Sequence, residues 1–204
     1  MRVPQTDVSL FLAPRATLPQ TDRARLTAAV ALVCSARGPV TIEQRCERCG
    51  GAHGRPRVLE PSAVHVSLSR AGHTVAVAVS LVGQIGVDIE SVTAVGRAGF
   101  DDVAFNATER TALAAVPVGE RDRARARIWT TKEALLKLSG QGLTVDPREL
   151  TVGWAGASVL WRWPTSTLDL NRVHVVGFDA GPGLIGTLAV FSAEAPEVEL
   201  RRDS

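Results

Sequence analysis

The stretch WTTKEALLKLSGQGL, residues 129–143, decides how this chain is organised. Its pattern predicts a helix that ends in a glycine-punctuated loop, and it holds the only two lysines of the chain, Lys132 and Lys137. On a helix, Trp129, Glu133 and Lys137 lie on successive turns of one stripe. Alone, such a segment is an ordinary surface helix with a Glu133–Lys137 pair worth about 0.2–0.5 kcal/mol. A function therefore depends on partners that other segments supply.

Composition indicates a globular protein of one or two small domains. The chain has 204 residues, 45% of them hydrophobic, which is enough to bury a core. No apolar run approaches the ~20 residues that span a bilayer, and the N-terminus lacks the cleavage pattern of a signal peptide, so we expect a cytoplasmic protein. A net charge of +2 is too small to indicate nucleic-acid binding, and three cysteines are too few for a disulfide scaffold.

The hydrophobic patterns predict an α+β fold in two halves, residues 1–95 and 96–204, each with a helix and about three strands. The three strands expected at residues 64–69, 74–82 and 85–91 follow one another closely and are expected to form an antiparallel meander. The tail EAPEVELRRDS is expected to fray. The expected strands are residues 8–13, 64–69, 74–82, 85–91, 159–163, 173–179 and 184–192, and the expected helices are residues 21–37, a helix opening at 106, and 120–139.

The segment GVDIE, residues 86–90, carries two acids at alternating positions. In a strand Asp88 and Glu90 point to one face. If the helix that contains Glu133 packs on that face, three carboxylates without histidine or cysteine form an oxygen site suited to Mg²⁺, which favours phosphate as a further ligand. Lysines beside such a site would balance phosphate charge. The combination indicates chemistry on a phosphate ester or anhydride.

These segments together resemble the 4′-phosphopantetheinyl transferases of the larger, surfactin-synthetase-activating type. GVDIE is followed some forty residues later by the pattern W-x-x-K-E-x-x-x-K at Trp129, Lys132, Glu133 and Lys137. Upstream, Gly54-Arg55-Pro56 resembles the G-[KR]-P element of the family, and Phe105 with Glu109 matches its F-x-x-x-E pattern. The resemblance covers roughly residues 54–143.

The resemblance implies a site that holds coenzyme A and Mg²⁺. Asp88, Glu90 and Glu133 would bind the Mg²⁺ together with the diphosphate of coenzyme A, while Lys137 and Lys132 would neutralise phosphate charge. The reaction it implies is attack by a carrier-protein serine on the β-phosphorus, which releases adenosine 3′,5′-bisphosphate. Glu133 or a metal-bound water is the candidate base, and the sequence does not choose between them.

The resemblance also implies two similar halves about a pseudo-twofold axis, with coenzyme A in the cleft between them and the protein active as a monomer. Arg55 would approach the 3′-phosphate of the adenosine end. The partner would be an acyl or peptidyl carrier protein of polyketide, nonribosomal peptide or fatty acid synthesis. Such carriers are acidic, and the arginines at 121, 123, 125 and 127 are a candidate contact for one.

One strand departs from the family pattern N-x-S-H-S. Aligned as Ser67-Leu68-Ser69-Arg70-Ala71, the chain has Arg70 in place of the histidine that contacts phosphate. Arginine binds phosphate bidentately, so Ser69 and Arg70 are counted as candidate cofactor-binding residues.

Two other classes of function remain open from the residues. A Mg²⁺-dependent nuclease or phosphohydrolase also combines acids with lysine, although nuclease D…E-x-K sites place the last two residues on a strand. A non-enzymatic zinc-loop module would use Cys46, Cys49 and His53, but a structural zinc site requires four ligands.

Overall fold

The computed structural model describes residues 6–16, 19–35, 38–45, 49–51, 54–155 and 158–203. Its strands are β1 (Val8–Pro14), β2 (Thr41–Gln44), β3 (Pro56–Glu60), β4 (His65–Ala71), β5 (Thr74–Ser80), β6 (Ile85–Ser91), β7 (Thr151–Ala155), β8 (Ser158–Arg162), β9 (Val173–Phe178), β10 (Leu184–Phe191) and β11 (Val198–Arg202). Its α-helices are α1 (Pro19–Cys34), α2 (Val92–Arg97), α3 (Asp101–Ala104), α4 (Ala107–Ala115) and α5 (Val118–Ser139), and short 3₁₀ turns lie at Gly142–Thr144, Pro147–Glu149 and Leu170–Arg172.

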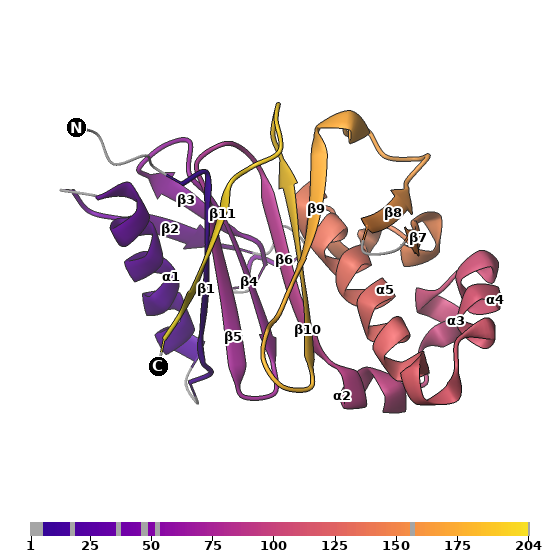
Figure 1. The fold of residues 1–204 in the computed structure, drawn as a ribbon. Coiled ribbons are helices and arrows are strands. Elements are labelled where there is room, and N and C mark those ends of the chain that lie inside the picture. Colours follow the sequence, from indigo (N-terminus) through magenta and orange to yellow (C-terminus); the bar gives the residue numbers. More distant parts are fainter. Residues whose placement is uncertain are drawn as a thin grey trace.

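Two sheets form the centre of the fold. The first has the strand order β11-β1-β5-β4 and the second β6-β10-β9, while β2-β3 and β7-β8 are separate hairpins. An apolar core joins the two sheets, formed by Val8, Leu10 and Leu12 of β1 together with Ile85 and Val87 of β6. The alternation of side chains along each strand leaves the other face of each sheet for a helix. Helix α1 covers the first sheet and α5 the second (Figure 1). The α+β prediction is confirmed.

The two sheets meet at the edges of β4 and β6 through serine side chains rather than a backbone ladder. The backbone N–H groups of Val87 and Ile89 donate to the hydroxyls of Ser67 and Ser69, at 3.0 and 3.3 Å. Helix α5 lies close over β6. A Cβ on Gly86 would stand only 2.0 Å from the carbonyl oxygen of Ala134. The glycine of GVDIE therefore allows the helix to approach the acid-bearing strand.

Two predictions, the pairing of one strand and the fraying of the tail, are wrong. β4 and β5 pair as a hairpin, but β6 leaves that sheet and pairs antiparallel with β10, so the three strands do not form a meander. The tail does not fray, because β11 pairs in parallel with β1. Both pairings join residues far apart in the chain, which local patterns do not encode.

The helical predictions hold with small shifts at the ends. Asn106 caps α4 with a capping box, in which Glu109 closes the second bond. Residues 92–104, between β6 and α4, contain the short helices α2 and α3. Within the described residues, no helix combines the length and the apolar character needed to cross a membrane.

Candidate active site

The acids of β6 face helix α5, as the alternation predicted. Ile85, Val87 and Ile89 point into the core between the sheets, so Asp88 and Glu90 point the other way. On α5 the side chains of Glu133 and Lys137 lie one turn apart on the flank toward β6 and β4, and Lys137 reaches Asp88.

Asp88 is the most enclosed of the three acids, with 3% of its surface exposed. Its Oδ1 accepts hydrogen bonds from Lys137 Nζ at 2.6 Å and from Ser69 Oγ at 2.7 Å. Lys137 Nζ also donates to the Val87 carbonyl at 3.1 Å. Burial raises the pKa of Asp88, and the charge of Lys137 opposes that rise. Asp88 Oδ2 is buried without a hydrogen-bond partner in the described structure.

The other two acids repel Asp88 and are partly desolvated. Burial, then the charge of Asp88, raise the pKa of Glu90 to about 7, against a hydrogen bond from Trp129 and the charge of Lys137. Burial, then the charge of Asp88, raise the pKa of Glu133 to about 7, and Lys137 opposes this shift. The charges of the three acids therefore interact in one region of low dielectric.

The donor set fits a divalent cation. A cation between the acids would bind the buried Asp88 oxygen that has no hydrogen-bond partner. It would also reduce the repulsion of Glu90 and Glu133 by Asp88. No three acids, histidines or cysteines of the described residues converge as a finished ligand cage. The three-acid Mg²⁺ site expected from the sequence is therefore not assembled in the described residues; Mg²⁺ itself needs only one or two carboxylates beside phosphate oxygens and waters.

Beside these acids lies a pocket of about 400 Å³, here called the arginine pocket. The β3 and β4 strands form one wall and the C-terminal end of α5 the other, so that the pocket lies between elements of the two sheet–helix layers. Its cationic lining is Arg45, Arg55, Arg57 and Lys137.

Arg55 is held against the end of α5. The helix ends at Gly140 in the left-handed region, with φ 76°, and a Cβ there would lie 2.5 Å from Arg55 Nη1. Burial, then the charge of Arg57, lower the pKa of Arg55. Several cations with no acid among the pocket residues make a site for a polyanion. Lys137 belongs both to this pocket and to the acid cluster.

Lys132 does not reach the site, contrary to the prediction that it neutralises phosphate. It lies five residues from Lys137, so the two side chains point about 140° apart around the helix. Lys132 is 0% exposed; its Nζ donates to Glu109 Oε2 at 2.6 Å and to the Ala104 carbonyl at 2.8 Å. The Phe105 ring lies 5.8 Å from the same nitrogen. The F-x-x-x-E pattern thus encloses this lysine and ties α5 to α4.

Arg70 is also turned away from the site, contrary to its assignment as a phosphate contact. Its Nε donates to Asp22 of α1 at 2.5 Å, on the face opposite Ser69. Ser67 and Ser69 both face β6, and Leu68 between them lines the arginine pocket. Leu68, and not Arg70, is therefore the residue of this part of β4 that lines the pocket beside the two serines. Ser69 lies in the site as expected, bonded to Asp88.

Of the four alternating arginines only two are exposed. Arg125 is 8% exposed and donates to Asp101 and to the carbonyls of Gly96 and Ala98. Arg121 donates to the carbonyls of Ala114 and Val116 at the end of α4. Arg121 and Arg125 are therefore bound within the fold, and of the four candidates for a carrier contact Arg123 and Arg127 are the exposed ones. The structure does not test the zinc hypothesis, because Cys46 and His53 lie outside the described residues.

The sequence analysis missed Arg45, Arg57 and Leu68 as pocket residues. A cluster of arginines around the G-R-P element was the available signal for the first two. Leu68 gave no signal, because an apolar residue on an alternating strand is the ordinary pattern of a core face.

The α+β fold places acids, one lysine and an arginine-lined pocket at the joint of two layers, and this arrangement suits a phosphate compound. Residues 84–163 match the model of the 4′-phosphopantetheinyl transferase superfamily. The match covers 80 of the 204 residues. No curated protein matches the sequence.

Solved structures similar to this chain are holo-acyl-carrier-protein synthases. The enzyme from Bacillus anthracis, in complex with CoA (3′,5′-ADP), is 17% identical over 55% of this chain and 98% of its own, with a TM-score of 0.47. The synthase from Thermotoga maritima is 17% identical over 55% of this chain and 65% of its own, with a TM-score of 0.46. The apo-ACPS structure from Chronobacterium ammoiniagenes is 18% identical over 52% of this chain and 92% of its own, with a TM-score of 0.41.

Proposed function

We propose that this protein transfers the 4′-phosphopantetheine group of coenzyme A to a serine of an acyl or peptidyl carrier protein, with Mg²⁺ as cofactor. The observation that carries the proposal is the position of Lys137, which lines the arginine pocket while its Nζ lies 2.6 Å from Asp88. A diphosphate bound beside Lys137 would place one end at the acids and the adenosine end among Arg45, Arg55 and Arg57.

The residues have separate roles in this reaction. The arginines bind the 3′-phosphate end, and Lys137 and Ser69 position Asp88 and the diphosphate. Asp88, Glu90 and Glu133 would hold Mg²⁺, which supplies electrostatic stabilisation to the charge that develops on the phosphate oxygens. Transfer of this type depends mainly on positioning and electrostatics.

In the chemical step the serine oxygen forms a bond to the β-phosphorus, and the bond from that phosphorus to the bridging oxygen breaks. The leaving group, adenosine 3′,5′-bisphosphate, keeps the electron pair of the broken bond. Glu133 accepts the serine proton, since it is a carboxylate at the acid cluster beside which the diphosphate would lie. This choice of base goes beyond what the residues alone indicated.

We also propose that the chain is of the larger, two-half type and acts as a monomer. Support comes from the arrangement of one long helix on the outer face of each sheet (Figure 1). The acids and the arginine pocket come from elements on both sides of the β4–β6 joint. The halves would be residues 1–95 and 96–204, with β6 and β11 exchanged between the sheets. Carriers of polyketide, nonribosomal peptide or fatty acid synthesis are the proposed partners.

The test is mass spectrometry of an apo carrier protein incubated with coenzyme A, Mg²⁺ and this protein. We expect the carrier to gain the mass of phosphopantetheine, and the gain to disappear with Asp88→Ala or Glu133→Ala. Arg110→Ala removes an exposed ion pair with Asp102 and is the control that retains activity. No gain on any carrier of the three pathways, with folded wild-type protein, would refute the proposal.

A further inference from the structure

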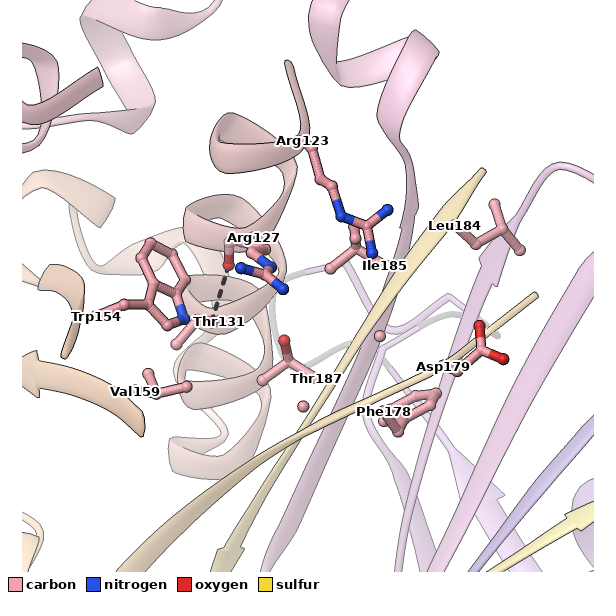
Figure 2. Close-up of a pocket in the computed structure, with 12 residues that line it drawn as sticks. Arg123, Arg127, Thr131, Trp154, Val159, Phe178, Asp179, Leu184, Ile185 and Thr187 are labelled. Atoms are coloured by element: carbon pink, nitrogen blue, oxygen red, sulfur yellow. Dashed lines mark hydrogen bonds between the residues drawn. The ribbon is translucent and has the colours of Figure 1, made fainter. Parts of the chain in front are cut away.

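A second pocket, here called the flank pocket, lies between α5, the β9–β10 hairpin and the β7–β8 hairpin (Figure 2). Its volume is about 450 Å³, within the range of small-molecule sites, roughly 300–1,000 Å³. Arg123, Arg127 and Thr131 line it from three successive turns of α5, and Trp154 and Gly177 line it from the hairpins.

Helix α5 separates this pocket from the active site. The side of the helix that faces the sheet is occupied by Thr130, whose hydroxyl lies 3.0 Å from that of Thr187, and by Ala134, which packs on Gly86. On one side of these two residues, Glu133 and Lys137 point toward β6 and β4. On the other side, Arg127 and Thr131 point toward β9. The flank pocket is therefore not an extension of the arginine pocket, and its occupant is independent of the proposed function.

The charge of the flank pocket is positive and uncompensated. Arg123 and Arg127 are exposed, and neither guanidinium has an ion pair or a hydrogen bond within the described residues. Asp179 is the single acid of the lining. Its carboxylate accepts from Arg202 at 3.1 Å and from the backbone N–H of Gly181 at 3.0 Å, so its charge is already balanced from outside the pocket.

The rest of the lining suits an apolar group. Trp154 and Val159 of the β7–β8 hairpin form a wall beside Arg127 (Figure 2). Gly177 pairs with Thr187 in the sheet, so a side chain at 177 would project on the same face as Thr187, into the pocket. A Cβ there meets nothing closer than the Gly186 carbonyl at 3.9 Å. The space over Gly177 is therefore open.

We propose that the flank pocket binds a small organic anion whose carboxylate or phosphate is held by Arg123 and Arg127 and whose apolar body lies against Trp154. Two guanidinium groups one turn apart bind such an anion through charge-assisted hydrogen bonds. An indole beside them accepts an aromatic or acyl body by stacking and dispersion.

The test uses 2-naphthoate as an aromatic carboxylate probe and 2-naphthol as its neutral counterpart, with affinities from isothermal titration calorimetry on the full chain. We expect saturable naphthoate binding, at least about tenfold tighter than naphthol. Arg123→Gln combined with Arg127→Gln should weaken naphthoate about tenfold or more. Gly177→Leu should abolish binding by filling the space, while Gly177→Ala retains it.

Arg97→Gln on α2 and Arg55→Gln in the arginine pocket are matched charge controls that should leave naphthoate affinity unchanged, and circular dichroism checks that each variant is folded. Lack of saturable binding to the wild type overturns the proposal, as does loss of binding in Arg55→Gln but not in Gly177→Leu. If the double arginine variant raises the KM for a carrier protein and leaves naphthoate affinity unchanged, the surface serves protein docking and the proposal also fails.

Discussion

Replacing Glu133 by glutamine should stabilise the metal-free protein while abolishing transfer. Burial and the charge of Asp88 raise the pKa of Glu133 from its ordinary value of 4.5 to about 7. The folded state therefore holds a proton that the unfolded chain releases between about pH 4.5 and pH 7, so the free energy of unfolding falls as pH rises through that window. The full difference of about 2.5 pKa units corresponds to about 3.4 kcal/mol at about 1.36 kcal/mol per unit. Partial exposure and the shared influence of Asp88 reduce this to about 1–2 kcal/mol.

Thermal unfolding in EDTA at pH 8 and at pH 4 measures the effect. Glu133→Gln should raise Tm at pH 8 by roughly 2–8 °C, given about 2–4 °C per kcal/mol for a chain of this size. At pH 4 the gain should vanish, because the wild-type carboxyl is then protonated in both states. Glu43→Gln, at an exposed position on β2, is the control and should show no such gain. A variant that is destabilised at pH 8, or equally stabilised at both pH values, would show that Glu133 carries no electrostatic strain and would remove the argument for a cation at this site.

Further outcomes follow from the same geometry. Mg²⁺ should raise Tm more at pH 8 than at pH 5, because protons compete for the carboxylates, and Asp88→Asn should remove that difference; an equal shift in the variant would show that Mg²⁺ binds elsewhere. Glu109→Ala leaves the charge of Lys132 buried without its partner, so urea unfolding should show a loss of about 3–5 kcal/mol; a loss below about 1 kcal/mol would contradict the structural role of the pair. Leu68→His should make the KM for coenzyme A fall as pH drops below about 6.5, since a protonated imidazole attracts phosphate and the cations of the arginine pocket lower its pKa; a KM that is independent of pH would place residue 68 outside the phosphate contacts.

The local parts of the site could be predicted from the sequence because they depend on short-range geometry. The period of a strand places Asp88 and Glu90 on one face, and the period of a helix places Glu133 and Lys137 on one stripe. The structure places all four at the junction of β6 and α5. The capping box at Asn106 is equally local.

Other assignments failed where the outcome depends on what packs against an element. Motif spacing treats Lys132 and Lys137 alike, yet Glu109 and Phe105 enclose the first, and Asp88 binds the second. Leu68 and Arg70 likewise share a face of β4, yet Leu68 lines the arginine pocket, whereas Asp22 of α1 binds Arg70.

The sequence by itself determined the α+β class and the faces of the acid strand and the lysine helix. Only the tertiary structure decided that β6 leaves its neighbours in the chain for β10 and that β11 joins β1. It also decided that α5 presents Glu133 and Lys137 on one flank and Arg123 and Arg127 on the other. The physical reason is that a repeat of two or 3.6 residues fixes which side chains share a face. Burial and charge pairing between segments distant in the chain fix what each face meets.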